Sequence, residues 1–156
     1  MKDVQTLLDE YGESHQNPVN KLFHWICVPV IVWTIVALLW VVPFPESIKL
    51  GGYPLNWAIV ALVLVQIYYF RLSLSLAIGM LIFVAAMLWV THWVAVNISL
   101  PLWQVAVGLF VIAWVGQFIG HAIEGKRPSF FKDVQFLLIG PAWLLSFIYK
   151  KAGIRI

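Results

Sequence analysis

Charge is scarce in this chain. Only 11% of its 156 residues are charged, whereas 62% are hydrophobic, and the mean hydropathy is +0.91. An ordinary soluble domain has about 25% charged residues, and a chain this short can bury only a limited share of its surface in a core. The shortage of charge therefore excludes a soluble globular domain and predicts one membrane domain comprising residues 1–156.

Cysteine is almost absent as well, since Cys27 is the only one. A single cysteine excludes an intrachain disulfide. The sequence also has no glycine-rich phosphate loop, no CxxC pair and no GxSxG elbow, which leaves nucleotide, redox-thiol and serine-hydrolase functions without support. The net charge of +3 is modest. It indicates attraction to anionic lipid or substrate and does not indicate nucleic-acid binding.

Long apolar runs take the place of charge. A helix that crosses a membrane needs about 20 mostly apolar residues. Four runs approach or exceed this length, and the second of them is short: Leu22–Pro43, Leu55–Phe70, Ser73–Val96 and Leu102–Ile123. The runs predict an all-α fold, a polytopic membrane helical bundle with about four transmembrane helices.

Two shorter segments flank these runs. Residues 1–12 predict a small amphipathic helix with four apolar side chains on one face: Val4, Leu7, Leu8 and Tyr11. The last apolar stretch, Val134–Tyr149, is short and is interrupted by Gly140 and Pro141. It therefore favours a re-entrant or interfacial helix at least as much as a fifth span.

The basic residues give a provisional orientation. With four spans, one side carries most of them: Lys2, Lys21, Arg71, Lys126, Arg127 and Lys132. The other side has Lys49, and the positive-inside rule then places both termini in the cytoplasm. Lys150, Lys151 and Arg155 follow the rule if the last helix does not cross. We expect a multi-pass protein of a bacterial inner membrane or the endoplasmic reticulum.

Four histidines carry the candidate chemistry. His15, His24 and His121 are expected to meet at the cytoplasmic face, whereas His92 lies about 30 Å along a helix from Arg71, near the opposite face. Neutral imidazole is a common ligand of zinc and iron. Two or three histidines with a carboxylate and open positions suit non-haem Fe(II).

Several polar residues lie near these histidines. Glu124 shares a helical face with His121. The candidates for holding the second ring nitrogen of a ligand histidine are Glu124, Tyr11, Asn17, Asn20 and Gln117. Lys126 and Arg127 follow directly and suit an anionic head group. The residues alone leave two other interpretations open: interfacial histidines that bond water, and an ordinary basic flank of a span.

Two motifs resemble a known family of small membrane proteins. The first runs from Tyr11 to Pro29 and contains HQNPVNK and His24, and the second is QFIGHAIEGKRP at residues 117–128. Both resemble the family that includes a fungal 2-hydroxy fatty acid dioxygenase of the endoplasmic reticulum, which acts in phytosphingosine breakdown. The resemblance covers nearly the whole chain.

The resemblance implies an activity and a ligand set. The expected activity is Fe(II)-dependent α-oxidation, in which a 2-hydroxy fatty acid and O2 give the acid one carbon shorter. His15, His24 and His121 are implied as iron ligands, with Glu124 as a further ligand or an orienting group. His92 is kept as a candidate fourth ligand. Lys126 or Arg127 is expected to steady the substrate head group, with the acyl chain between apolar helices.

Two rival functions stay open at this point. A lipid hydroxylase or desaturase of the di-iron type calls for about eight histidines, and the chain has four. A non-enzymatic lipid- or metal-binding membrane protein, or a transporter subunit, is the other alternative. The absence of charges deep in the spans argues against ion transport.

Overall fold

The computed structural model describes residues 3–129 and 135–156, and its regular secondary structure is helical apart from two two-residue strands. The helices are α1 (Val4–Gly12), α2 (Pro18–Val41), α3 (Trp57–Leu72), α4 (Leu74–Asn97), α5 (Leu102–Glu124) and α6 (Phe136–Ala152). The strands β1 (Lys49–Leu50) and β2 (Tyr53–Pro54) pair antiparallel in the α2–α3 loop. The all-α prediction is confirmed. Lys2, Lys132 and the predicted start at Val134 lie outside the described residues.

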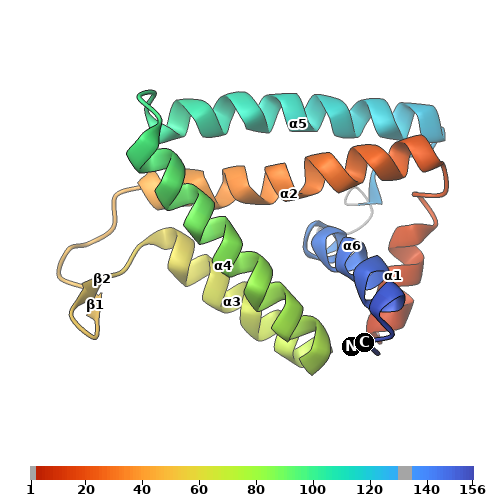
Figure 1. Ribbon diagram of the computed structural model, residues 1–156, viewed down its shortest axis with the longest axis horizontal. Helices are drawn as coiled ribbons and strands as arrows, with labels where there is room; N and C mark the ends of the chain where they lie inside the picture. The colour runs from red at the N-terminus through yellow and green to blue at the C-terminus, as the bar shows by residue number, and fades with distance from the viewer. Residues whose placement is uncertain (1–2, 130–134) are drawn as a thin grey trace.

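The helices form two pairs with α1 and α6 between them. Figure 1 shows α2 and α5 running side by side, with α3 and α4 as a second pair that diverges from the first at an angle. α1 and α6 fill the wide end of this angle, where both chain termini lie. The amphipathic N-terminal helix α1 therefore lies where the two pairs are farthest apart.

Among the described residues, three helices are long and apolar enough to cross a membrane, namely α2, α4 and α5. α3 is also apolar, but its 16 residues extend only about 24 Å. That is shorter than a hydrocarbon core of about 30 Å, and it agrees with the short second run of the sequence. α6 is not among the spanning helices, and it continues through Pro141 where the sequence predicted an interruption.

Local sequence sets the start of α2. The side chain of Asn17 accepts a hydrogen bond from the N–H of Val19, and Pro18 takes the first helical position. Both residues favour a helix start. α2 therefore begins four residues before the predicted Leu22, which places His24 in its second turn instead of its first.

The main core lies between α1, α6 and the α3–α4 pair. All four apolar residues predicted for one face of the N-terminal helix are buried: Val4, Leu7, Leu8 and Tyr11. They belong to the same core as Ile139 and Trp143 of α6 and Leu76 of α4. Hydrogen bonds also tie the C-terminal segment to α4, because Ser75 Oγ donates to the carbonyl of Arg155 and Tyr149 donates to that of Ser75. This core holds α1, and with it His15, in a fixed place.

Candidate metal centre

Three histidines from separate elements meet in the interior. His15 follows α1, His24 lies in α2 and His121 lies in the last turn of α5. Their ring centroids are 4.1 to 5.0 Å apart, and the exposed fractions of the side chains are 1%, 2% and 5%. One ring nitrogen from each lies within 4.8 Å of the others. The cluster is therefore compact enough to hold one metal ion.

The backbone orients two of the rings. Nδ1 of His15 lies against the carbonyl oxygen of Tyr11, and Nδ1 of His24 lies 2.9 Å from that of Asn20. A carbonyl oxygen can only accept, so each Nδ1 must carry the hydrogen and donate it. In the neutral rings this leaves both Nε2 atoms with bare lone pairs. Metal-bound histidines use the same device, in which the second nitrogen donates to a carbonyl.

The two Nε2 atoms of His15 and His24 are only 2.8 Å apart. Two lone pairs at this distance repel each other unless a cation lies close to both. Burial, together with the His24 ring, lowers the pKa of His15 to about 3, so His15 does not supply a proton at neutral pH. A metal ion fits the arrangement.

The third ring supports the same conclusion. Nδ1 of His121 is buried and has no hydrogen-bond partner within residues 3–129 and 135–156. A buried polar atom without a partner costs about 1–3 kcal/mol. An ion shared with His15 and His24 removes this cost through coordination or through a shift of the ring.

Glu124 supports the cluster from outside. Its carboxylate accepts hydrogen bonds from the backbone N–H of Gln16 at 2.9 Å and of Asn17 at 2.8 Å, and from Asn20 Nδ2 at 3.1 Å. These donors lie at the N-terminus of α2, which favours negative charge. Both carboxylate oxygens are thus engaged by the chain, and Glu124 is not in the group that can share an ion. Glu124 therefore lies outside the three-histidine group and is bonded to the segment that begins α2.

Asn20 joins the two helices that carry His24 and His121. Its side-chain amide donates hydrogen bonds to the backbone carbonyl of Ser14 and to Glu124. Its backbone carbonyl accepts a hydrogen bond from Nδ1 of His24. Gly120 makes the close approach possible, because a Cβ at this position would lie 2.5 Å from Asn20 Oδ1. Asn17, another residue predicted to support the ligands, caps α2.

Aromatic rings enclose the cluster on the α1–α6 side. Tyr11 stacks on His15 with ring centroids 4.2 Å apart and an interplanar angle of 12°. The ring centroid of Trp143 lies 5.2 Å from that of His15 and 6.5 Å from that of His24. Trp143 is not among the predicted residues, because nothing in the local sequence separates it from the other eight tryptophans.

The side chains of the predicted residues Lys126, Arg127 and His92 are exposed, unlike the three clustered rings. Lys126 is exposed, and its Nζ donates to the carbonyl of Glu13 at 2.6 Å. Arg127 is exposed. His92 is exposed near the end of α4 that connects to α5, whereas His121 lies at the other end of α5. The structure therefore does not bring His92 into the cluster as a fourth ligand.

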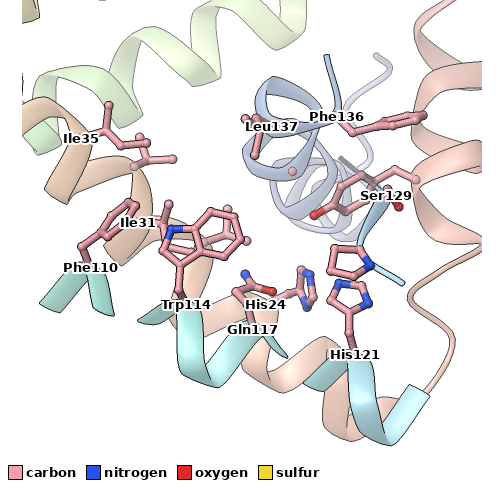
Figure 2. A pocket seen from close by; sticks show the side chains of 15 residues that line it. His24, Ile31, Ile35, Phe110, Trp114, Gln117, His121, Ser129, Phe136 and Leu137 are labelled. Carbon is pink, nitrogen blue, oxygen red and sulfur yellow. The ribbon is translucent and has the colours of Figure 1, made fainter. Parts of the chain in front are cut away.

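An apolar cavity of about 290 Å³ adjoins His24 and His121. Figure 2 shows these two rings and Gln117 at one end and Ile35 and Phe110 at the other. From His24 to Ile35 the wall extends about 16 Å along α2. Its lining is Tyr11, His24, Val28, Ile31, Val32, Ile35, Phe110, Trp114, Gln117, His121, Pro128, Ser129, Phe136, Leu137 and Gly140. The cluster thus opens onto a space suited to a long apolar group with a polar end.

Comparison with known proteins identifies a family. The family model described as 2-hydroxy-palmitic acid dioxygenase Mpo1-like matches residues 1–152. The chain is also 32% identical over 153 residues to the 2-hydroxy-palmitic acid dioxygenase MPO1 of Saccharomyces cerevisiae. The aligned region covers 95% of this chain and 81% of that protein. No solved structure matches the chain. Because the family model spans almost the full length and includes all three clustered histidines, the chain belongs to the Mpo1-like family.

Proposed function

We propose that this protein is an Fe(II)-dependent membrane dioxygenase that converts a 2-hydroxy fatty acid and O2 into the fatty acid one carbon shorter. The observation that carries the proposal is the buried cluster of His15, His24 and His121 at the end of an apolar cavity. The similarity to a 2-hydroxy-palmitic acid dioxygenase supports the substrate class.

The donor set suits iron. Three neutral imidazoles leave open positions and suit iron as well as zinc, and the similarity to a dioxygenase favours iron. When bound, the iron ion would accept the substrate head group and supply the one-electron chemistry that O2 requires. His15, His24 and His121 would hold it, and the carbonyl oxygens of Tyr11 and Asn20 would keep the first two rings in the ligating tautomer.

The overall reaction balances without an added reductant. One 2-hydroxy acid and one O2 give one shorter acid, one CO2 and one water, with cleavage of the bond between C1 and C2. C2 rises from the alcohol to the carboxylic acid level and C1 leaves as CO2, so the substrate supplies all four electrons that O2 accepts. The proposal therefore requires no electron-transfer partner.

The chain's own residues would bind the substrate and exclude water. Val28 and Ile31 are buried parts of the cavity wall, and they would surround the acyl chain. Ile35 and Leu137 also line the cavity, yet 44% and 45% of their surfaces are exposed. A cavity with such a rim is open to the surrounding bilayer, which supports lateral entry of a lipid substrate.

The basic segments support an orientation for the protein. Lys126 is bonded to the carbonyl of Glu13, and the C-terminal segment is bonded to α4 close to Arg71. We place this end, with both termini, in the cytoplasm by the positive-inside rule. A reporter that is active only in the cytoplasm, fused after Ile156, should be active, and an inactive but intact fusion would contradict this orientation.

Product formation by the purified protein tests the function. Iron-loaded protein in detergent, incubated in air with 2-hydroxypalmitate, should form pentadecanoate and CO2 in equal amounts. Palmitate, which lacks the 2-hydroxyl, is the matched substrate control and should give no product. Absence of the shorter acid from 2-hydroxy acids of several chain lengths, in protein shown to contain iron, would remove the proposed activity.

A further inference from the structure

Two neutral polar side chains, Ser129 and Gln117, line the cavity that adjoins the histidines. Ser129 is 3% exposed, and its hydroxyl has no hydrogen-bond partner within the described parts of the chain. Gln117 is 5% exposed and lies one helical turn before His121 on α5. Both line the cavity, and Figure 2 labels both beside the two histidines that reach it.

A buried hydroxyl without a partner lowers stability, so its presence needs a reason. The rest of the cavity is almost wholly apolar, and neither Lys126 nor Arg127 lines it. The polar atoms that reach a ligand at this end therefore come from neutral side chains and imidazoles. A serine hydroxyl can donate to a carboxylate, and a glutamine oxygen can accept from a hydroxyl.

We propose that Ser129 and Gln117 form the head-group subsite: the Ser129 hydroxyl donates to the substrate carboxylate, and the Gln117 side-chain oxygen accepts from the 2-hydroxyl. The inference rests on the proposed function and replaces Lys126 and Arg127 as the residues that steady the head group. Both are positioning residues, which fix where C1 and C2 lie relative to the three histidines.

The two assignments predict different selectivity. A carboxylate is common to 2-hydroxypalmitate and palmitate, so Ser129→Ala should weaken the binding of both acids. Only the first acid has the 2-hydroxyl, so Gln117→Leu, which nearly preserves the side-chain volume, should weaken its binding alone. Loss of a hydrogen bond to a charged group corresponds to about a tenfold or larger rise in Kd.

Stability separates this role from a structural one. Ser129→Ala removes an unpartnered buried hydroxyl, so the thermal midpoint of the ligand-free protein should stay the same or rise. A serine that held the fold together would show the reverse. Ser146→Ala is the control, because Ser146 Oγ donates to the carbonyl of Trp143 and does not line this cavity. It should leave the binding of both acids unchanged.

Equilibrium dialysis of radiolabelled 2-hydroxypalmitate and palmitate against the iron-loaded protein, without O2, measures binding with no turnover. The proposal predicts the selectivity pattern above, with a thermal midpoint for Ser129→Ala that stays the same or rises. Equal affinity of wild type and Ser129→Ala for both acids would overturn the subsite while leaving the activity intact. If the wild type binds neither acid, both the subsite and the proposed function fail, and the product assay would confirm the second failure.

Discussion

Histidines lie near both ends of the α2–α5 pair, but the two ends differ in how far these side chains are buried and in which groups contact them. At one end, His15, His24 and His121 are buried, and backbone carbonyls orient two of the rings. At the other end, His92 is exposed and does not line the apolar groove to which Val90 and Trp93 contribute. The comparison teaches that a histidine near a helix end becomes a candidate ligand through buried partners from other elements.

The largest expected effect is the loss of metal binding when one histidine of the buried cluster is removed. His24→Ala removes one of the three proposed ligand rings and leaves His15 Nε2 without its neighbour, so metal affinity should fall by more than about a hundredfold, beyond the usual loss for a supporting residue. Activity should fall with it. His92→Ala, the matched change at the other end, should leave both unchanged. Metal analysis of the purified variants decides, and retained iron in His24→Ala would refute the proposed ligand set.

Glu124→Ala should have the next largest effect. It removes the acceptor for three donors at the start of α2, which should weaken metal binding about tenfold to a hundredfold. The free energy of unfolding should fall by about 1–3 kcal/mol. Glu46→Ala in the exposed loop after α2 is the control. An unchanged metal affinity in Glu124→Ala, measured by competition with a chelator, would mean that Glu124 does not orient the site.

Gly120→Ala and Gly108→Ala compare close packing at two positions on α5. A Cβ at residue 120 would lie 2.5 Å from Asn20 Oδ1, whereas at residue 108 it meets nothing within 4 Å. Overpacking typically costs about 1–3 kcal/mol, so Gly120→Ala should lower the thermal midpoint in detergent. Gly108→Ala should leave it unchanged or raise it slightly. Equal midpoints for the two variants would show that α2 and α5 are not in close contact near the cluster.

The smallest expected effect concerns the two apolar hollows beside α2. Val28 lines the cavity that adjoins the cluster, and Val30 lines the groove at the other end. Val28→Phe should fill part of the acyl site and raise KM for 2-hydroxypalmitate a few-fold to about tenfold, since steric changes of this size are worth about 1 kcal/mol or more. Val30→Phe should leave KM unchanged. A larger effect from Val30→Phe would place the acyl chain in the other groove.

The sequence predicted the features of the fold that depend on residues close together in the chain. The buried face of α1 follows from the spacing of Val4, Leu7, Leu8 and Tyr11. The short α3 follows from the length of its apolar run. The earlier start of α2 could also have been predicted, because Asn17 and Pro18 are strong start residues. Helix propensity and hydrophobic periodicity decide these features, and both are readable in a single chain.

The roles of individual polar residues could not be predicted in the same way. Spacing does not show that Gln16, Asn17 and Asn20 surround the carboxylate of Glu124, because these contacts arise only in the fold. Trp143 reaches the site through the packing of α6, and Ser129, after the end of α5, lines the cavity. These contacts join residues that are far apart in sequence, so spacing carries no record of them.

X-ray absorption at the iron edge tests the central claim most directly. Iron-loaded wild-type protein, prepared without O2, should contain one iron per chain and give the scattering pattern of three imidazole ligands. The triple variant His15→Ala, His24→Ala and His121→Ala should contain no specifically bound iron. Iron bound at full occupancy in that variant, or an imidazole pattern that persists in it, would contradict the account.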